Sequence, residues 1–223
     1  MDDTLSEPLL KGHRPRLTPE RLAAPRKAAR TRQAILDAAA GFLRDEPFRD
    51  LTVALLMAEA GASRPTFYLY FEDLYDLMRT LLEEIREAIL KGAAPWFTTE
   101  ENPPEALRRS LRGLVEVGLQ SGAILRAIAE AAPFDPVLES AWNDFLGSFD
   151  AAVAARIEQH QARGLIAPLP ATATAIALNR MDAGVLIKEF GTPHQGDPEL
   201  VHQSLCRIWI SSLYGPIRQP EHP

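Results

Sequence analysis

Apolar residues recur at spacings of three and four along most of this chain, and that periodicity predicts helices rather than strands. Prolines and glycines divide the periodic stretches into pieces of helical length. The expected helices cover residues 25–44, 73–91, 105–121, 123–131, 135–163, 170–190 and 198–214, with two shorter ones inside 51–71 and a loop at 92–104. The predicted fold class is therefore all-α, with a three-helix N-terminal head at 25–72 and a larger helical domain at 73–217.

The segment 51–71 has the pattern of two short helices joined by a tight turn. Thr52 is placed to cap the first helix, whose apolar residues repeat at helical spacing. Gly61 can adopt a left-handed turn without a steric penalty, and Ser63 is placed to cap the second helix with its hydroxyl. An apolar stripe on residues 25–44 supplies the rest of a small core.

The second short helix predicts a helix-turn-helix surface for reading DNA. Phe67 and Phe71 are four residues apart and can anchor this helix to the core, which leaves the polar side chains facing outward. Arginine suits guanine edges or phosphate, and hydroxyl groups suit phosphate oxygens. Pro65 fits because its missing N–H is no loss in the first turn. The predicted DNA-binding residues are Thr52, Ser63, Arg64, Pro65, Thr66, Tyr68 and Tyr70.

Positive charge is concentrated before the head. Residues 11–32 hold eight basic side chains and one acidic side chain, although the whole chain has a formal net charge of -6. This asymmetry brings cations to the head and leaves an acidic body, so residues 1–24 are expected to form a flexible basic arm that orders on DNA. The alternative is a solvated tail without function.

The run from residue 34 to residue 77 resembles the DNA-binding head of the TetR family of one-component repressors. The stretches ALNRMDAGVLIKEF and CRIWISSLYG, with Trp142 and Phe149 upstream, are similar to the EthR-like branch of that family. The resemblance implies a homodimer that binds a palindromic double-stranded DNA operator and is released by an apolar small-molecule effector. It also implies that residues 73–217 bind the ligand and dimerise through their last two helices, with a short tail at 218–223.

The start of the helix after the head departs from the family pattern. Asp73 and Leu74 stand where the family usually has serine and lysine, so a phosphate contact is missing. Glu72, Asp73 and Asp76 make this end acidic, and we expect them to cap the helix internally and repel phosphate.

An aromatic stripe on residues 135–163 has two interpretations. Large side chains here can fill an ordinary core, or they can line a ligand cavity opposite the smaller residues of 105–121. The resemblance implies that Asn179 binds polar ligand atoms and that Trp142 and Phe149 line a hydrophobic tunnel. The predicted ligand-binding residues are Trp142, Phe145, Phe149, Asn179, Asp182, Leu114 and Trp209.

Asn179 and Asp182 share one helix face and require hydrogen-bond partners if they are buried. For Asn179 the alternative is an interhelix or dimer hydrogen bond. For Asp182 it is a surface pair with Arg180 or Lys188.

Other functional classes receive little support. The five histidines are scattered, Cys206 has no evident base nearby, and no metal-ligand spacing or phosphate loop occurs, so we expect neither an enzyme nor a cofactor. Cys206 is expected to be buried. No apolar run approaches a membrane span and the start is too acidic for a signal peptide, which predicts a cytoplasmic protein without a membrane partner. A regulator controlled by a protein partner, or by no small molecule, and a purely structural bundle remain as alternatives.

Overall fold

The structure, a computed structural model, describes residues 25–215, so the predicted arm 1–24 and tail 218–223 lie outside the described residues. Helices and their connections make up this range, and no strand occurs in it. The helices are α1 (Pro25–Asp45), η2 (Phe48–Asp50), α2 (Val53–Glu59), α3 (Arg64–Tyr70), α4 (Leu74–Thr98), α5 (Pro103–Ala131), η3 (Ala132–Phe134), α6 (Pro136–Ala162), α7 (Ala171–Phe190) and α8 (Pro198–Tyr214).

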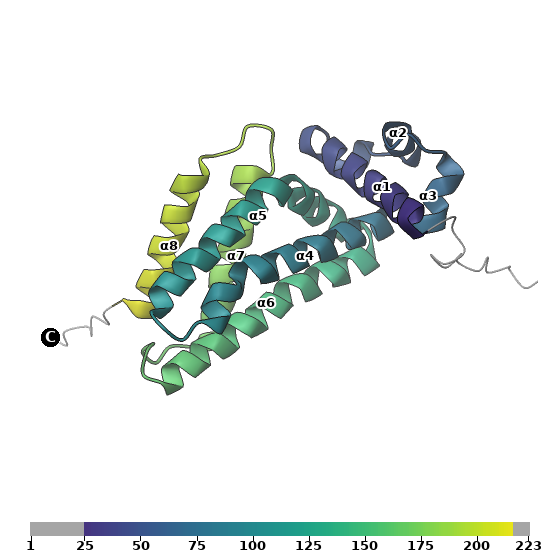
Figure 1. The fold of residues 1–223 in the computed structure, drawn as a ribbon. Helices are drawn as coiled ribbons and strands as arrows, with labels where there is room; N and C mark the ends of the chain where they lie inside the picture. Colours follow the sequence, from purple (N-terminus) through teal and green to yellow (C-terminus); the bar gives the residue numbers. More distant parts are fainter. Residues whose placement is uncertain (1–24, 216–223) are drawn as a thin grey trace, which may run out of the picture.

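Helices α1, α2 and α3 form a head at one end of the molecule, and α4 to α8 form the body (Figure 1). The head closes over a small core in which Ile35, Leu43 and Phe67 are fully buried. The predicted stripe on α1 supplies two of these residues, and Phe67 of α3 supplies the third. The three-helix head predicted from the sequence is therefore present.

Helix α4 joins the head to the body. Its first turns, including Leu77 and Met78, belong to the same apolar cluster as the head core. Further along, α4 packs lengthwise on α5, and the two helices meet at Gly92 and Gly113. A Cβ atom on Gly113 would lie 2.7 Å from the carbonyl oxygen of Gly92, so the two backbones touch with no side chain between them.

Two expected breaks are wrong. Residues 105–121 and 123–131 belong to the single helix α5, because Gly122 is required by close packing and does not end the helix. A Cβ on Gly122 would lie 2.7 Å from the backbone of Phe190 on α7. The loop expected at 92–104 is also mostly helical, since α4 continues through Pro95 to Thr98, where Trp96 is buried and anchors the last turn.

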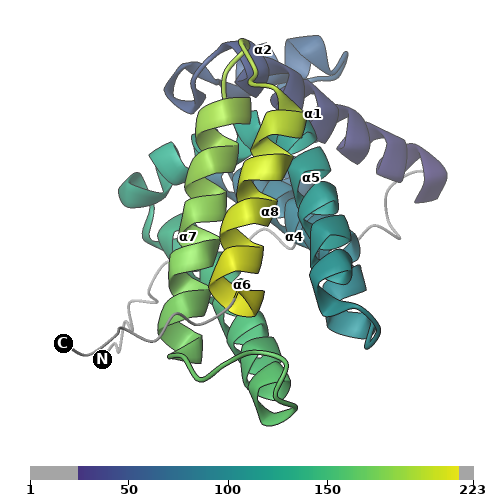
Figure 2. The ribbon, with the colours of Figure 1, turned by 90° about the vertical axis from the view of Figure 1, so that its left-hand side faces the viewer.

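Helices α7 and α8 lie side by side on one face of the body, and Figure 2 shows them in front of the other described helices. Ile176 of α7 and Ile208 of α8 are 41% and 43% exposed, although both are large and apolar. None of the described helices combines the length and apolar composition that crossing a membrane requires.

Candidate DNA-binding surface and ligand cavity

The turn between α2 and α3 has the geometry that its sequence predicts. The Thr52 hydroxyl accepts a hydrogen bond from the backbone N–H of Leu55 at 3.2 Å and so caps α2. Gly61 has a φ of 62°, the left-handed conformation that glycine adopts without strain. Ser63 departs from the prediction, because its hydroxyl contacts the Thr66 hydroxyl at 2.8 Å and caps no backbone N–H.

Helix α3 presents a polar face away from the head core. Phe67 is buried, and Phe71 packs against it with 5.4 Å between ring centroids, as the four-residue spacing predicts. Arg64 and Pro65 are exposed, and the Tyr68 side chain is 51% exposed. Of the predicted DNA-binding set, the exposed members are Thr52, Ser63, Arg64, Pro65 and Tyr68, whereas Thr66 and Tyr70 are half-buried.

The acidic start of α4 is capped from within, as predicted. The Asp73 carboxylate accepts a hydrogen bond from the Asp76 N–H at 2.8 Å, and Asp76 accepts one from the Glu72 N–H at 2.9 Å. Arg79 pairs with Asp76 at 3.1 Å. The carboxylates thus occupy the Asp76 N–H and place negative charge at this helix end, which disfavours a phosphate there.

A cavity of about 100 Å³ lies inside the body, between α4, α5, α6, α7 and α8. Its walls are almost entirely apolar. Trp142 and Phe145 stack at 5.4 Å, and Phe149 meets Phe145 edge-on at 5.1 Å. All seven residues predicted to bind a ligand line this one space: Leu114, Trp142, Phe145, Phe149, Asn179, Asp182 and Trp209.

Asn179 makes the interhelix hydrogen bond considered as its alternative role. Its side-chain N–H donates to Asp150 of α6 at 3.0 Å, and Arg180 pairs with the same carboxylate at 2.8 Å. Arg180 is thus committed to Asp150, and the predicted surface pair between Arg180 and Asp182 is absent. The sequence analysis did not identify Asp150, a buried acid on α6.

Asp182 is buried inside the body. Its side chain is 5% exposed and its Oδ1 accepts a hydrogen bond from the indole N–H of Trp209 on α8 at 3.0 Å. Burial raises the pKa of Asp182 to about 7, against the opposing effect of the Trp209 hydrogen bond. The carboxyl group therefore changes its charge near neutral pH.

Comparison with known proteins matches both parts of the chain. Residues 35–81 match the model of bacterial regulatory proteins of the tetR family, and residues 107–215 match the C-terminal domain of the transcriptional regulator EthR. The HTH-type transcriptional regulator EthR of Mycobacterium tuberculosis is 33% identical over 190 residues, covering 82% of this chain and 86% of that protein. This chain belongs to the TetR family. The EthR of Mycolicibacterium smegmatis is 31% identical over 189 residues, covering 82% and 85%.

Solved structures share the fold of this chain. The MbdR regulator from Azoarcus sp. CIB superposes with a TM-score of 0.68 at 19% identity, over 84% of this chain and 99% of that one. GusR from Salmonella enterica gives a TM-score of 0.66 at 17% identity, over 86% and 98%. The chain is thus a TetR-family transcriptional regulator with an EthR-like C-terminal domain.

Part of the cavity wall in this TetR-family body was not predicted. Ile89, Trp96 and Phe97 line the cavity from α4, and the last two fall in the stretch expected to be a loop. Trp96 donates its indole N–H to the Tyr214 hydroxyl at 2.8 Å and its backbone N–H to Ser110 at 2.9 Å. Two adjacent aromatic residues in a supposed loop were the signal that this segment is buried.

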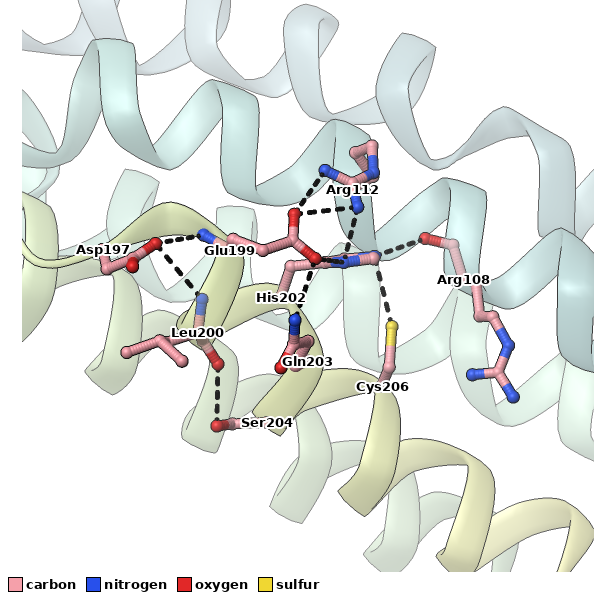
Figure 3. Close-up of polar contacts among 9 residues, drawn as sticks. All are labelled: Arg108, Arg112, Asp197, Glu199, Leu200, His202, Gln203, Ser204 and Cys206. Atoms are coloured by element: carbon pink, nitrogen blue, oxygen red, sulfur yellow. Dashed lines mark hydrogen bonds and ion pairs between the residues drawn. The ribbon is translucent and has the colours of Figure 1, made fainter.

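The surroundings of Cys206 agree with a regulator rather than an enzyme. The expectation that no base lies nearby is wrong, since Nε2 of His202 lies 3.2 Å from Sγ (Figure 3). However, Arg112 donates to Nδ1 of His202 at 3.0 Å, so the ring proton is on Nε2, which donates to the carbonyl oxygen of Arg108 at 3.0 Å. This ring cannot accept the thiol proton, and burial raises the pKa of Cys206. The thiol is buried and not activated.

Proposed function

We propose that this TetR-family regulator is a repressor that binds a palindromic operator as a homodimer and releases it when an apolar small molecule enters the body. The observation that carries the proposal is the apolar cavity, because α4 forms part of its wall and begins at the head. A ligand that reshapes this wall acts directly on the element that positions α3.

Contact with DNA is assigned to the exposed face of α3. Arg64 and Tyr68 present a guanidinium and a phenol at the surface, held in place by the buried Phe67. A short helix of this kind enters the major groove with its N-terminal residues toward the bases. Since α4 caps itself internally, cations elsewhere in the chain are expected to neutralise phosphate. Lys27 and Arg30 on α1 are exposed, whereas Arg32 lies 3.8 Å from Glu84.

Dimerisation is assigned to the outer face of α7 and α8. Ile176 and Ile208 are exposed apolar residues of these two helices, which lie in front of the other described helices in Figure 2. Pairing with a two-fold mate would bury them in a four-helix interface. To read successive major grooves on one side of DNA, such a dimer must hold its two copies of α3 about 34–36 Å apart.

Head and body are joined by a second contact besides α4. Arg126 of α5 donates to the carbonyl oxygen of Leu43 near the end of α1, at 3.2 Å. A shift of α5 around the cavity therefore reaches the head through α1 as well. A coupling of about 1–3 kcal/mol per site is enough to change operator affinity about 5- to 150-fold.

The DNA-binding part is tested by mobility shift on the intergenic DNA beside the gene. Arg64→Ala and Tyr68→Phe should each weaken binding by about 1–3 kcal/mol, since each removes one direct contact. Arg109→Ala, which removes an exposed arginine from the body, is the matched control and should bind as the unmodified protein does. Equal loss in all three variants would show that α3 is not the reading helix.

The effector part is tested by filling the cavity. Ala183 lines it, so Ala183→Phe should leave operator binding intact and abolish release by the apolar compounds that raise the melting temperature of the unmodified protein. Ala155→Phe places the same ring on the exposed side of α6 and should respond normally. A normal response in Ala183→Phe would instead favour control by a protein partner.

A further inference from the structure

The cavity contains one ionisable side chain, that of Asp182. The other lining residues, from all five body helices α4 to α8, are apolar or neutral; the neutral polar ones include Ser110 of α5 and Asn179 of α7. Ser110 is already engaged, because it donates to the carbonyl oxygen of Ala93 at 2.7 Å and accepts from the Trp96 N–H. The Asp182 carboxylate is therefore the main polar group that a ligand would meet.

That carboxylate has no cationic partner among the described residues. Its Oδ1 is bound by the neutral Trp209 indole, and within the described part of the chain no hydrogen bond reaches Oδ2. Arg180, the basic residue two positions before it, pairs with Asp150. Lys188 is exposed to solvent.

Arg156 and His160, which lie near Trp96, also have hydrogen-bond partners other than Asp182. Arg156 donates to the carbonyl oxygens of Trp96 and Thr99, at 3.0 and 2.9 Å. His160 contacts the Tyr214 hydroxyl at 2.8 Å. Neither side chain lines the cavity, so neither compensates a charge on Asp182.

We infer that the effector carries a protonated amine on a compact apolar body, and that this amine pairs with the free oxygen of Asp182. The inference rests on the proposed function and replaces its wholly apolar effector by one that carries a single cationic group into the same cavity. A buried carboxylate without a cation is unfavourable, and an ammonium group supplies both the charge and the N–H donors that it lacks. Above about pH 7, where Asp182 is ionised, a ligand bearing a carboxylate would add a second negative charge and should not bind.

The size of the cavity limits the apolar part of the ligand. About 100 Å³ is smaller than an engineered apolar cavity of about 150 Å³ that binds benzene, so the ligand must be compact, and one aromatic ring with a short arm enters only if the cavity wall widens. Trp142 and Phe145 offer stacked faces to such a ring. A suitable probe is 2-phenylethylamine, with 2-phenylethanol as the neutral isostere and 3-phenylpropionate as the anionic analogue.

The test is calorimetric titration of the full chain with these three probes at pH 8. The amine should bind about 10- to 100-fold more tightly than the alcohol, the range expected for a hydrogen bond to a charged group, and the acid should not bind. Asp182→Asn should remove the advantage of the amine and retain binding of the alcohol, which also shows that the variant folds. Asp144→Asn, a change at an exposed acid on α6, should leave the preference unchanged.

A second readout is the pH profile. Because the pKa of Asp182 is about 7, amine affinity should rise about tenfold from pH 6 to pH 8 in the unmodified protein and stay flat in Asp182→Asn. Equal affinity for amine and alcohol, absence of binding by the amine, or an unchanged preference in Asp182→Asn would overturn the inference. Amine binding that depends on Asp182 but does not release DNA would support the ligand class and overturn the proposed function.

Discussion

Replacing Asp182 by asparagine should make the protein more stable at neutral and alkaline pH. The amide keeps the shape of the carboxyl group and can still accept from Trp209, but it does not ionise. In the folded chain burial raises the pKa of Asp182 from 3.8 to about 7. The folded state therefore holds this proton where the unfolded state has released it, so stability is full below about pH 3.8 and falls as pH rises toward about 7.

The size of the effect follows from the two pKa values. The interval from 3.8 to about 7 corresponds to about 4 kcal/mol of lost stability, of which about 3 kcal/mol falls between pH 5 and pH 8. Urea denaturation of both proteins should be measured at fixed chain concentration. From pH 5 to pH 8, the free energy of unfolding of Asp182→Asn should rise by about 3 kcal/mol relative to that of the unmodified protein. All other titrating groups are common to both chains and cancel. A gap that does not change with pH would mean that Asp182 is solvated, and the reasoning would fail.

Three further substitutions test the packing described above by urea denaturation. Gly122→Ala should destabilise the protein by about 1–3 kcal/mol, because the new methyl group meets the backbone of α7, whereas Gly147→Ala, on an open face of α6, should stabilise it by about 0.5–1 kcal/mol. Similar effects from both would show that α5 and α7 are not in close contact. Thr52→Ala removes the cap of α2 and should lower the free energy of unfolding by about 1 kcal/mol. Thr52→Ser keeps the hydroxyl and should retain most of that stability. Arg156→Met leaves the buried carbonyl oxygen of Trp96 without its donor and should cost about 1–3 kcal/mol, and a neutral result would place water there instead.

The head could be predicted almost residue by residue, because its signals are local. A capping threonine, a glycine at a left-handed turn and an apolar residue every third or fourth position act within one or two helical turns. The exceptions were Thr66 and Tyr70, which were expected to face outward and are half-buried, and the cap at Ser63. The Ser63 hydroxyl had a second partner, Thr66, within reach, and the sequence does not show which of the two contacts is made.

The body was harder to predict because its glycines and prolines serve contacts between distant segments. Gly122 looks like a helix break in the sequence, but it is where α7 approaches α5. Pro95 looks like a loop residue, but α4 continues through it to Thr98 because the next residue, Trp96, is buried. Asp150 was missed for the same reason, since its partners Asn179 and Arg180 are about 30 positions away. The cavity residues were identified through the resemblance and the aromatic stripe, and their role in binding a ligand stays a prediction.

The contact between Gly92 and Gly113 gives α4 unequal arms. With a rise of about 1.5 Å per residue, the helix extends about 27 Å from Gly92 back to Leu74 and about 9 Å forward to Thr98. A rigid rod rocking on that point acts as a lever with a ratio of about three, so a 1 Å push at its short end moves the long end about 3 Å. Under the proposed mechanism, the glycine pair is the pivot at which a small expansion of the body becomes a larger displacement of the head.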